Sequence, residues 1–180
     1  VHVQSWQTTY ANLLDTDYLQ QLSLAQREQA WRESLQKLEH PILVLENDRD
    51  RIVGFVSGGA NREPNLADGA YDAEVYALYL LAQVQGQGWG AQLLRSMLRL
   101  LEEQGYHSAV VWALKGNPAI TFYQHHGATF LQEKTIRIGG KLYRETALVW
   151  NRLNEQRGDV HNDSKAKRTN NDISREYTES

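Results

Sequence analysis

The hydrophobic pattern of the N-terminal part predicts two helices followed by a β-hairpin. Apolar residues recur at helical spacing at 5–14 and, after a capping Asp15 or Thr16, as far as about residue 37. Two apolar runs at 42–45 and 52–57 then flank a polar turn, which is typical of paired antiparallel strands.

The rest of the pattern predicts two strands with a helix between them, then a second helix and a second hairpin. The expected elements are a strand at 71–81, a helix at 91–104, a strand at 109–114, a helix at 117–127, and strands at 128–138 and 141–150. The run 109–114 is apolar throughout, which favours a strand buried in a parallel pair. A right-handed crossover then gives an α/β (α+β) fold, in which a mixed, mostly antiparallel central sheet contains one parallel strand pair and carries helices on both faces.

Composition limits the class of protein. The 180 residues suffice for one domain with a hydrophobic core, since 41% of them are hydrophobic. The net charge of −3 argues against a binder of nucleic acid or of membrane surfaces, and no stretch is apolar enough for a membrane span. The lack of cysteine excludes disulfides and catalysis by a protein thiol. The N-terminal segment shows no signal-peptide pattern, so we expect a cytoplasmic location.

The character of the chain changes after residue 150. Residues 1–150 are expected to form one domain, and residues 151–180 a polar tail with six basic and six acidic residues. Because almost nothing in the tail beyond Leu153 is apolar, it cannot bury enough surface to order itself, and we predict that it is disordered.

The most informative segment is Gln85-Gly86-Gln87-Gly88-Trp89-Gly90-Ala91, which joins a predicted strand to a predicted helix. Alternating glycines allow positive φ and a close approach of the backbone, so several N–H groups can point at one spot. The N-terminus of the following helix adds a partial positive charge there. The segment therefore predicts a phosphate-bearing ligand that is held mainly by backbone groups.

Three alternatives apply to such a turn. The spacing Gly86-x-Gly88-x-x-Ala91 fits a relaxed dinucleotide motif, but the next strand ends Ala113-Leu114-Lys115-Gly116, without the acidic residue that would hold a ribose. A nucleotide-hydrolase loop needs Gly-Lys-Ser/Thr, and Trp89-Gly90 breaks that pattern. A tight connection that binds nothing is the third alternative.

Further motifs decide between these alternatives. Gln85-x-x-Gly88-x-Gly90 follows Leu78-Tyr79-Leu80, and downstream lies a run from Asn117 through Phe122-Tyr123 to Gly127. This combination resembles the GCN5-related N-acetyltransferase (GNAT) family over roughly residues 1–150, including the ending that follows Gly139-Gly140. The resemblance implies transfer of an acetyl group from acetyl-CoA to an amine acceptor, without a metal. The sequence departs from the family pattern in two ways. The strand that usually precedes the first helix is missing, and a polar tail follows the domain.

The resemblance also implies where the coenzyme lies. Its pyrophosphate would contact the backbone N–H groups of Gln85, Gly86, Gln87, Gly88, Trp89 and Gly90, with Ala91 in the first turn of the helix. Its pantetheine arm would pair like an added strand with Leu78, Tyr79 and Leu80, for which the two parallel strands must splay apart. Asn117 would bond the coenzyme, cap its own helix, or do both.

The implied chemistry is direct attack of a neutral amine on the thioester. Tyr123 resembles the tyrosine that protonates the departing thiolate, with a core aromatic as the alternative. The N–H of Leu78 or Tyr79 would polarise the thioester carbonyl. Glu74 is the candidate base, because strand alternation predicts that it shares a face with Tyr76, Leu78 and Leu80. A salt bridge of Glu74 to an arginine, or proton transfer through water alone, are the alternatives.

The acceptor pocket is expected at the N-terminal helix. Trp6 and Tyr10 share one face of that helix and could line the pocket together with Tyr76. Packing of that helix on the sheet is the alternative, and it is favoured more for Trp6 than for Tyr10. His125 and His126 have no third ligand at a suitable spacing, so no metal site is predicted. An acetyl-CoA-binding module without turnover is the alternative function, and a homodimer is one way to cover the sheet edge left by the missing strand.

Overall fold

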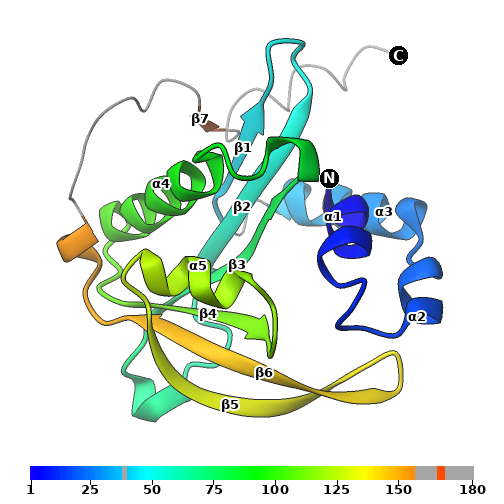
Figure 1. Cartoon of the computed structure of the whole chain (residues 1–180). Coiled ribbons are helices and arrows are strands. Elements are labelled where there is room, and N and C mark those ends of the chain that lie inside the picture. Colours follow the sequence, from blue (N-terminus) through cyan, green and yellow to red (C-terminus); the bar gives the residue numbers. More distant parts are fainter. Residues whose placement is uncertain (38–39, 157–165, 169–180) are drawn as a thin grey trace.

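The computed structural model describes residues 1–37, 40–156 and 166–168 (Figure 1). The helices are α1 (His2–Thr9), α2 (Thr16–Gln20), α3 (Leu24–Lys37), α4 (Trp89–Glu103) and α5 (Ala119–His125), with short 3-10 turns η1 (Leu66–Gly69), η2 (Ala82–Val84) and η3 (Leu153–Gln156). The strands are β1 (Ile42–Glu46), β2 (Ile52–Ala60), β3 (Ala73–Leu80), β4 (Ala109–Leu114), β5 (Thr129–Ile138), β6 (Lys141–Trp150) and β7 (Ala166–Arg168).

The strands form one sheet in the order β5-β6-β4-β3-β2-β1-β7. The β3–β4 pair is parallel, and the other pairs in the described part of the chain are antiparallel. Helices α4 and α5 pack on one face, where Leu94 and Met97 are fully buried, and α1 to α3 lie over the other face. The predicted fold class is therefore confirmed.

The parallel pair is short. Hydrogen-bonded register joins Ala73–Val75 to Ala109–Val111, after which β3 and β4 run apart (Figure 1). The splayed arrangement that the family resemblance implied is thus present. It leaves one edge of β3 without a neighbouring strand over residues 76–80.

A β-bulge interrupts β3 and corrects one sequence prediction. The register with β2 shifts between Ser57 and Gly58, whose partners are Ala77 and Val75, so Tyr76 is an extra residue. Because a one-residue insertion reverses the alternation of side chains, Leu78 and Leu80 pack in the core under α4 together with Val75. The prediction that Glu74 shares a face with Leu78 and Leu80 was therefore wrong.

The N-terminal helices differ from the prediction in their ends. The first helix ends at Thr9, because Tyr10 leaves helical geometry with φ −102° and ψ 8°. The second predicted helix is divided into α2 and α3. Asp15 caps α2 by accepting bonds from the backbone N–H groups of Asp17 and Tyr18, and the Ser23 hydroxyl accepts one from Gln26 at 3.2 Å near the start of α3.

Two segments beyond residue 150 form short elements, a 3-10 turn and a strand, where the sequence predicted none. Leu153 is buried in η3 against the core, and β7 pairs antiparallel with β1, at the edge where a second subunit was considered. The rest of the predicted tail lies outside the described residues, and the homodimer stays a prediction. None of the helices in the described ranges has an apolar run long enough to cross a membrane.

The core under α4 yields a stability prediction. Leu94→Ala removes a side chain with 0% exposure, so we expect a loss of about 2–5 kcal/mol in the free energy of unfolding. The matched control is Leu142→Ala, since that leucine is 64% exposed and its truncation should cost less than about 0.5 kcal/mol. Urea unfolding measures both, and equal effects would contradict this packing.

Candidate active site

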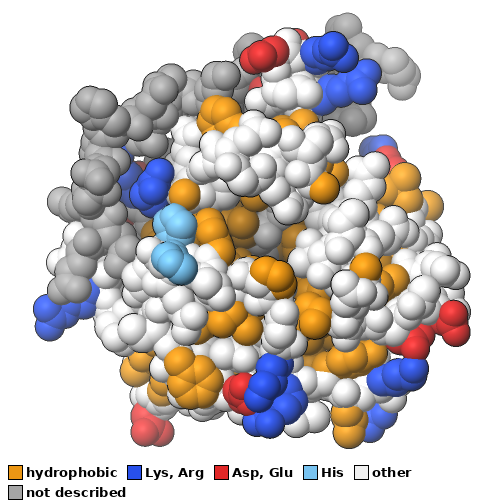
Figure 2. All heavy atoms as spheres, in the orientation of Figure 1, with side chains coloured by type: hydrophobic (Ala, Val, Ile, Leu, Met, Phe, Trp, Pro, Cys, Tyr) orange, Lys and Arg blue, Asp and Glu red, His pale blue; other side chains and the backbone are white. Residues whose placement is uncertain are grey.

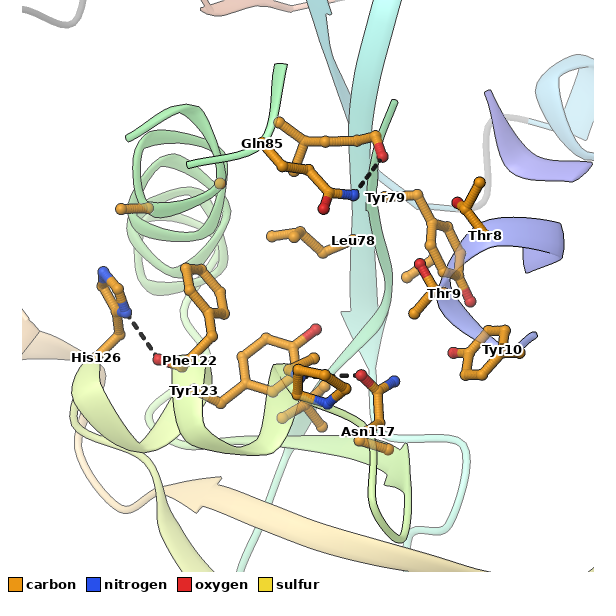
Figure 3. Close-up of a pocket in the computed structure, with 18 of the residues that line it drawn as sticks. Thr8, Thr9, Tyr10, Leu78, Tyr79, Gln85, Asn117, Phe122, Tyr123 and His126 are labelled. Atoms are coloured by element: carbon orange, nitrogen blue, oxygen red, sulfur yellow. Dashed lines mark hydrogen bonds between the residues drawn. The ribbon is translucent and has the colours of Figure 1, made fainter. Parts of the chain in front are cut away.

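A cleft of about 750 Å³ opens where β3 and β4 part (Figure 3). Residues of α1, β3, the glycine turn, β4 and α5 form its walls, and Figure 2 shows the molecule hollowed near its centre, with hydrophobic side chains inside. The lining includes Thr8, Thr9, Tyr10, Asn12, Tyr76, Leu78, Tyr79, Leu80, Gln85, Gly86, Gly88, Gly90, Ala91, Trp112, Asn117, Phe122, Tyr123 and His126.

The glycine turn presents unbonded N–H groups to this cleft. Gly86 and Gly88 have φ of +71° and +86°, and a Cβ at either position would meet nothing within 4 Å. The N–H groups of Gly86, Gly88, Gly90 and Ala91 have no hydrogen-bond partner among the described residues. They lie at the N-terminus of α4, where the helix dipole favours negative charge, so the geometry of the turn suits a phosphate group.

The side chains of the turn stabilise it instead of lining the anion site. Gln85 Nε2 donates to the carbonyl of Leu80 at 3.0 Å, which ties the turn to the end of β3 (Figure 3). Gln87 Nε2 donates to the carbonyl of Gln83 at 3.0 Å, and the ring of Trp89 packs against the core. Gln87 and Trp89 are not among the lining residues, so any contact of theirs with a ligand would come from the backbone.

The free edge of β3 offers a second set of backbone groups. Leu78, Tyr79 and Leu80 all line the cleft, opposite the diverging β4. Successive residues of a strand direct their N–H and C=O groups to alternate sides, and one side of β3 is paired with β2. Alternate groups on the other side therefore face the cleft and can pair with the amides of an extended ligand.

Helix α5 and the loop just before it place two polar side chains in the opposite wall. Tyr123 is buried, and its hydroxyl is directed into the cleft (Figure 3) and has no hydrogen-bond partner among the described residues. Burial, and then the neighbouring Tyr79, raise the pKa of the Tyr123 phenol above its usual value, so the hydroxyl stays protonated. Just before α5, Asn117 Oδ1 accepts the N–H of Ala119 at 2.9 Å, and its Nδ2 group has no hydrogen-bond partner in the described part of the chain.

The other end of the cleft is aromatic. Tyr10, Tyr76 and Tyr79 line it, as does Trp112, whose position within an apolar strand gave no sequence signal. Burial, and then Tyr79, raise the pKa of the Tyr10 phenol. The Tyr76 hydroxyl donates to the carbonyl of Ala60 at 2.7 Å, which fixes its ring at the rim.

Trp6 does not line this cleft. It stacks edge-on with Tyr10, with ring centroids 5.0 Å apart, and borders a separate cavity between α1, α2 and α3. Of the three acceptor-side residues predicted from the sequence, Tyr10 and Tyr76 are brought together at the cleft and Trp6 supports Tyr10 from behind. This is the packing role that the sequence left open for Trp6.

Glu74 is held in an ion pair. Its carboxylate is 2% exposed and accepts hydrogen bonds from the backbone N–H of Arg62 at 3.1 Å and from Nε at 3.0 Å, with a shorter contact to Nη2. The carboxylate is not among the groups that line the cleft. The structure thus shows the salt bridge that the sequence gave as the alternative to a basic role.

Comparison with known proteins now identifies the family. Residues 6–128 match the model of the acetyltransferase (GNAT) family. The chain belongs to the GNAT family. It is an acetyl-CoA-dependent N-acetyltransferase, and no group of three or more potential metal ligands occurs in the part of the chain that the structure describes.

Individual relatives agree with this assignment. The uncharacterized N-acetyltransferase YuaI of Bacillus subtilis is 35% identical over 150 residues, which are 83% of each chain. The L-methionine sulfoximine/L-methionine sulfone acetyltransferase of Pseudomonas paraeruginosa is 26% identical and covers 74% of this chain and 75% of its own. YncA of Salmonella typhimurium, solved with acetyl-CoA, has the same fold, with a TM-score of 0.59 and 22% identity over 90% of this chain and 87% of its own.

The cleft of this GNAT chain fits the coenzyme. Free N–H groups beside open space at Gly86 and Gly88 suit the pyrophosphate, and the unpaired edge of β3 suits the amides of pantetheine. The sequence missed Thr8, Thr9 and Asn12 of the α1 wall, because helix ends and loops carry no periodic signal.

The glycine turn yields a binding prediction. Gly88→Asp should weaken coenzyme A binding at least about 100-fold, because it places a carboxylate against phosphate and strains the positive φ. Gly105→Asp is the matched control, since Gly105 also has positive φ (+92°) and open space but lies at the other end of α4. Calorimetric titration with coenzyme A measures both variants, and equal affinities would contradict the assigned phosphate site.

Proposed function

We propose that this N-acetyltransferase transfers the acetyl group by direct attack of a small primary amine on the bound thioester. The single observation that carries the proposal is the Tyr123 hydroxyl, which faces the cleft, opposite the free edge of β3, and has no hydrogen-bond partner among the described residues. In this arrangement the coenzyme lies along β3 with its pyrophosphate on the glycine turn. The N–H of Leu78 or Tyr79 polarises the thioester carbonyl.

Tyr123 supplies the proton that the leaving group needs. As the carbon–sulfur bond breaks, the phenol donates its proton to the thiolate of coenzyme A. The raised pKa of Tyr123 keeps that proton in place at neutral pH. It also makes the phenolate a strong base, which recovers a proton from the nitrogen that has just been acylated. The two transfers together return Tyr123 to its starting state.

The acceptor enters from the aromatic end. Tyr10 and Tyr76 are fixed by packing and by a hydrogen bond, so they form a rigid wall for a small aliphatic amine. The Pseudomonas relative is named for the acetylation of L-methionine sulfoximine and L-methionine sulfone. We therefore propose the α-amino group of a small amino acid of this kind as the acceptor to test first, alongside polyamines, aminoglycosides and peptide N-termini.

Removing the phenolic hydroxyl tests the mechanism. Tyr123→Phe should lower kcat at least about tenfold with L-methionine sulfone or the best amine of the panel, while coenzyme A affinity stays within about twofold. Tyr71→Phe is the control. The hydroxyl of this buried tyrosine donates a hydrogen bond of 2.9 Å to Asn151, and Tyr71 does not line the cleft. Unchanged kcat in Tyr123→Phe across all acceptors would remove the acid role. A wild-type protein that binds coenzyme A but acetylates none of the amines would favour a binding module.

A further inference from the structure

A second cluster of charged side chains lies beside the acceptor end of the cleft. In the sheet register, Glu145 of β6 is opposite Leu114 of β4 and Lys134 of β5. Directly paired residues share a face, so these side chains lie with Trp112 on the face away from α4. The hydrophobic cluster that includes α1 covers this face on one side, and the cluster around η1 covers it on the other.

Two cations of the cluster are held over aromatic rings of the cleft. The guanidinium carbon of Arg62 is 4.6 Å from the ring centroid of Tyr76, and Lys134 Nζ is 3.8 Å from that of Trp112. Each cation also has a close carboxylate partner, Glu74 for Arg62 and Glu63 for Lys134. The cluster thus stands directly behind the aromatic lining of the acceptor pocket.

The pairing leaves one carboxylate over. Glu145 is 21% exposed, and its nearest cation, Lys134, is 3.9 Å away, beyond hydrogen-bond distance. Among the described residues no group donates a hydrogen bond to it. Of the three carboxylates in the cluster, Glu63 and Glu74 are neutralised at close range, and Glu145 is the one left to receive a further cation.

The surroundings act on Glu145 from several elements. Burial raises the pKa of its carboxyl; Lys134 and Arg62 oppose this, while Glu63 and Glu74 add to it. Its charge in turn contributes to the raised pKa of Tyr10 and of Tyr79, after the larger effect of burial. The carboxylate therefore lies within electrostatic reach of two hydroxyls that line the cleft.

We propose that Glu145 takes the proton of the acceptor's ammonium group through a water, since its carboxylate, like that of Glu74, is not among the groups that line the cleft. This inference rests on the proposed amine acetylation and names its base. The geometry that supports it is the position of this half-buried carboxylate behind Tyr10, Tyr79 and Trp112, with Lys134 at 3.9 Å and no hydrogen-bond donor among the described residues.

The proton balance is complete without another reactant. One ammonium N–H bond breaks and its proton moves to the carboxylate, which frees the nitrogen lone pair to attack the thioester carbon. The carbon–sulfur bond breaks and the thiolate takes the Tyr123 proton. A second proton leaves the acylated nitrogen and restores Tyr123. The first proton stays on Glu145 and passes to solvent.

Glu145→Gln tests this role. With a carboxylate base, kcat/KM rises with pH as the carboxyl ionises through its raised pKa, and then stays level until the free amine forms in solution. Without it, kcat/KM follows the fraction of free amine and rises tenfold per pH unit to the pKa of the amine. At pH 7 we expect Glu145→Gln to lose about 100-fold in kcat/KM with L-methionine sulfone, with unchanged coenzyme A affinity.

Two matched variants complete the test. Glu133 of β5 is 18% exposed and ion-paired to Lys115 and Arg144, but it is opposite Thr146 and so lies on the other face. Glu133→Gln should keep the wild-type pH profile. Glu74→Gln should lower the thermal unfolding temperature and keep the profile as well. The proposal would be overturned if Glu145→Gln kept the wild-type dependence of kcat/KM on pH. It would also be overturned if Glu74→Gln, and not Glu145→Gln, lost the level region of that dependence.

A measurement without turnover separates this inference from the proposed function. Carboxyl ¹³C titration of the coenzyme A complex should show a raised pKa for one glutamate resonance that disappears in Glu145→Gln. A pKa in the ordinary range for that resonance would overturn the role of Glu145, whether or not the wild type acetylates an amine. A wild type that acetylates no amine while this pKa is raised would instead contradict the proposed function.

Discussion

The early end of pairing between β3 and β4 is the constraint on which the rest of the structure depends. Backbone N–H and C=O groups inside a protein need hydrogen-bond partners. Along residues 76–80 of β3, β4 supplies none on the side that faces it. The N–H groups of the glycine turn also lack partners within the helix, because the first hydrogen bond of α4 runs from the N–H of Gln92 to the carbonyl of Gly88. A ligand that carries amides next to phosphates satisfies both sets at once. In the proposed binding mode, coenzyme specificity therefore depends mainly on backbone groups.

The bulge at Tyr76 divides the two faces of the same strand between different tasks. Before it, Val75 faces α4 and Glu74 pairs with Arg62; after it, Leu78 faces α4 and Tyr79 faces α1. One extra residue therefore lets a single strand supply a core face, an aromatic wall and a coenzyme edge. The same insertion holds the Tyr76 ring at the rim, where its hydroxyl reaches the carbonyl of Ala60.

The sequence predicted most of the fold and located the glycine turn that lines the cleft, because both depend on local patterns. Periodicity predicted the strands and α4, and glycine spacing located the turn whose N–H groups face the cleft. What it missed depends on contacts between distant residues. The bulge needs the register of β2, the Arg62–Glu74 pair joins residues across a loop, and Trp112 sits in a run that reads only as a buried strand. The acceptor end is assembled from such long-range contacts, so its residues could not be ranked from the sequence.

The charge pattern at the acceptor end has no explanation in stability alone. A half-buried carboxylate without a hydrogen bond is costly, and a glutamine at position 145 would balance two cations against two carboxylates. The chain nevertheless places a glutamate there, next to two positions where opposite charges are paired at close range. Residues that lower local stability are expected where a site performs chemistry. In the proposed reaction the protonated amine supplies the cation that balances Glu145, and that charge is present before the reaction and gone after it.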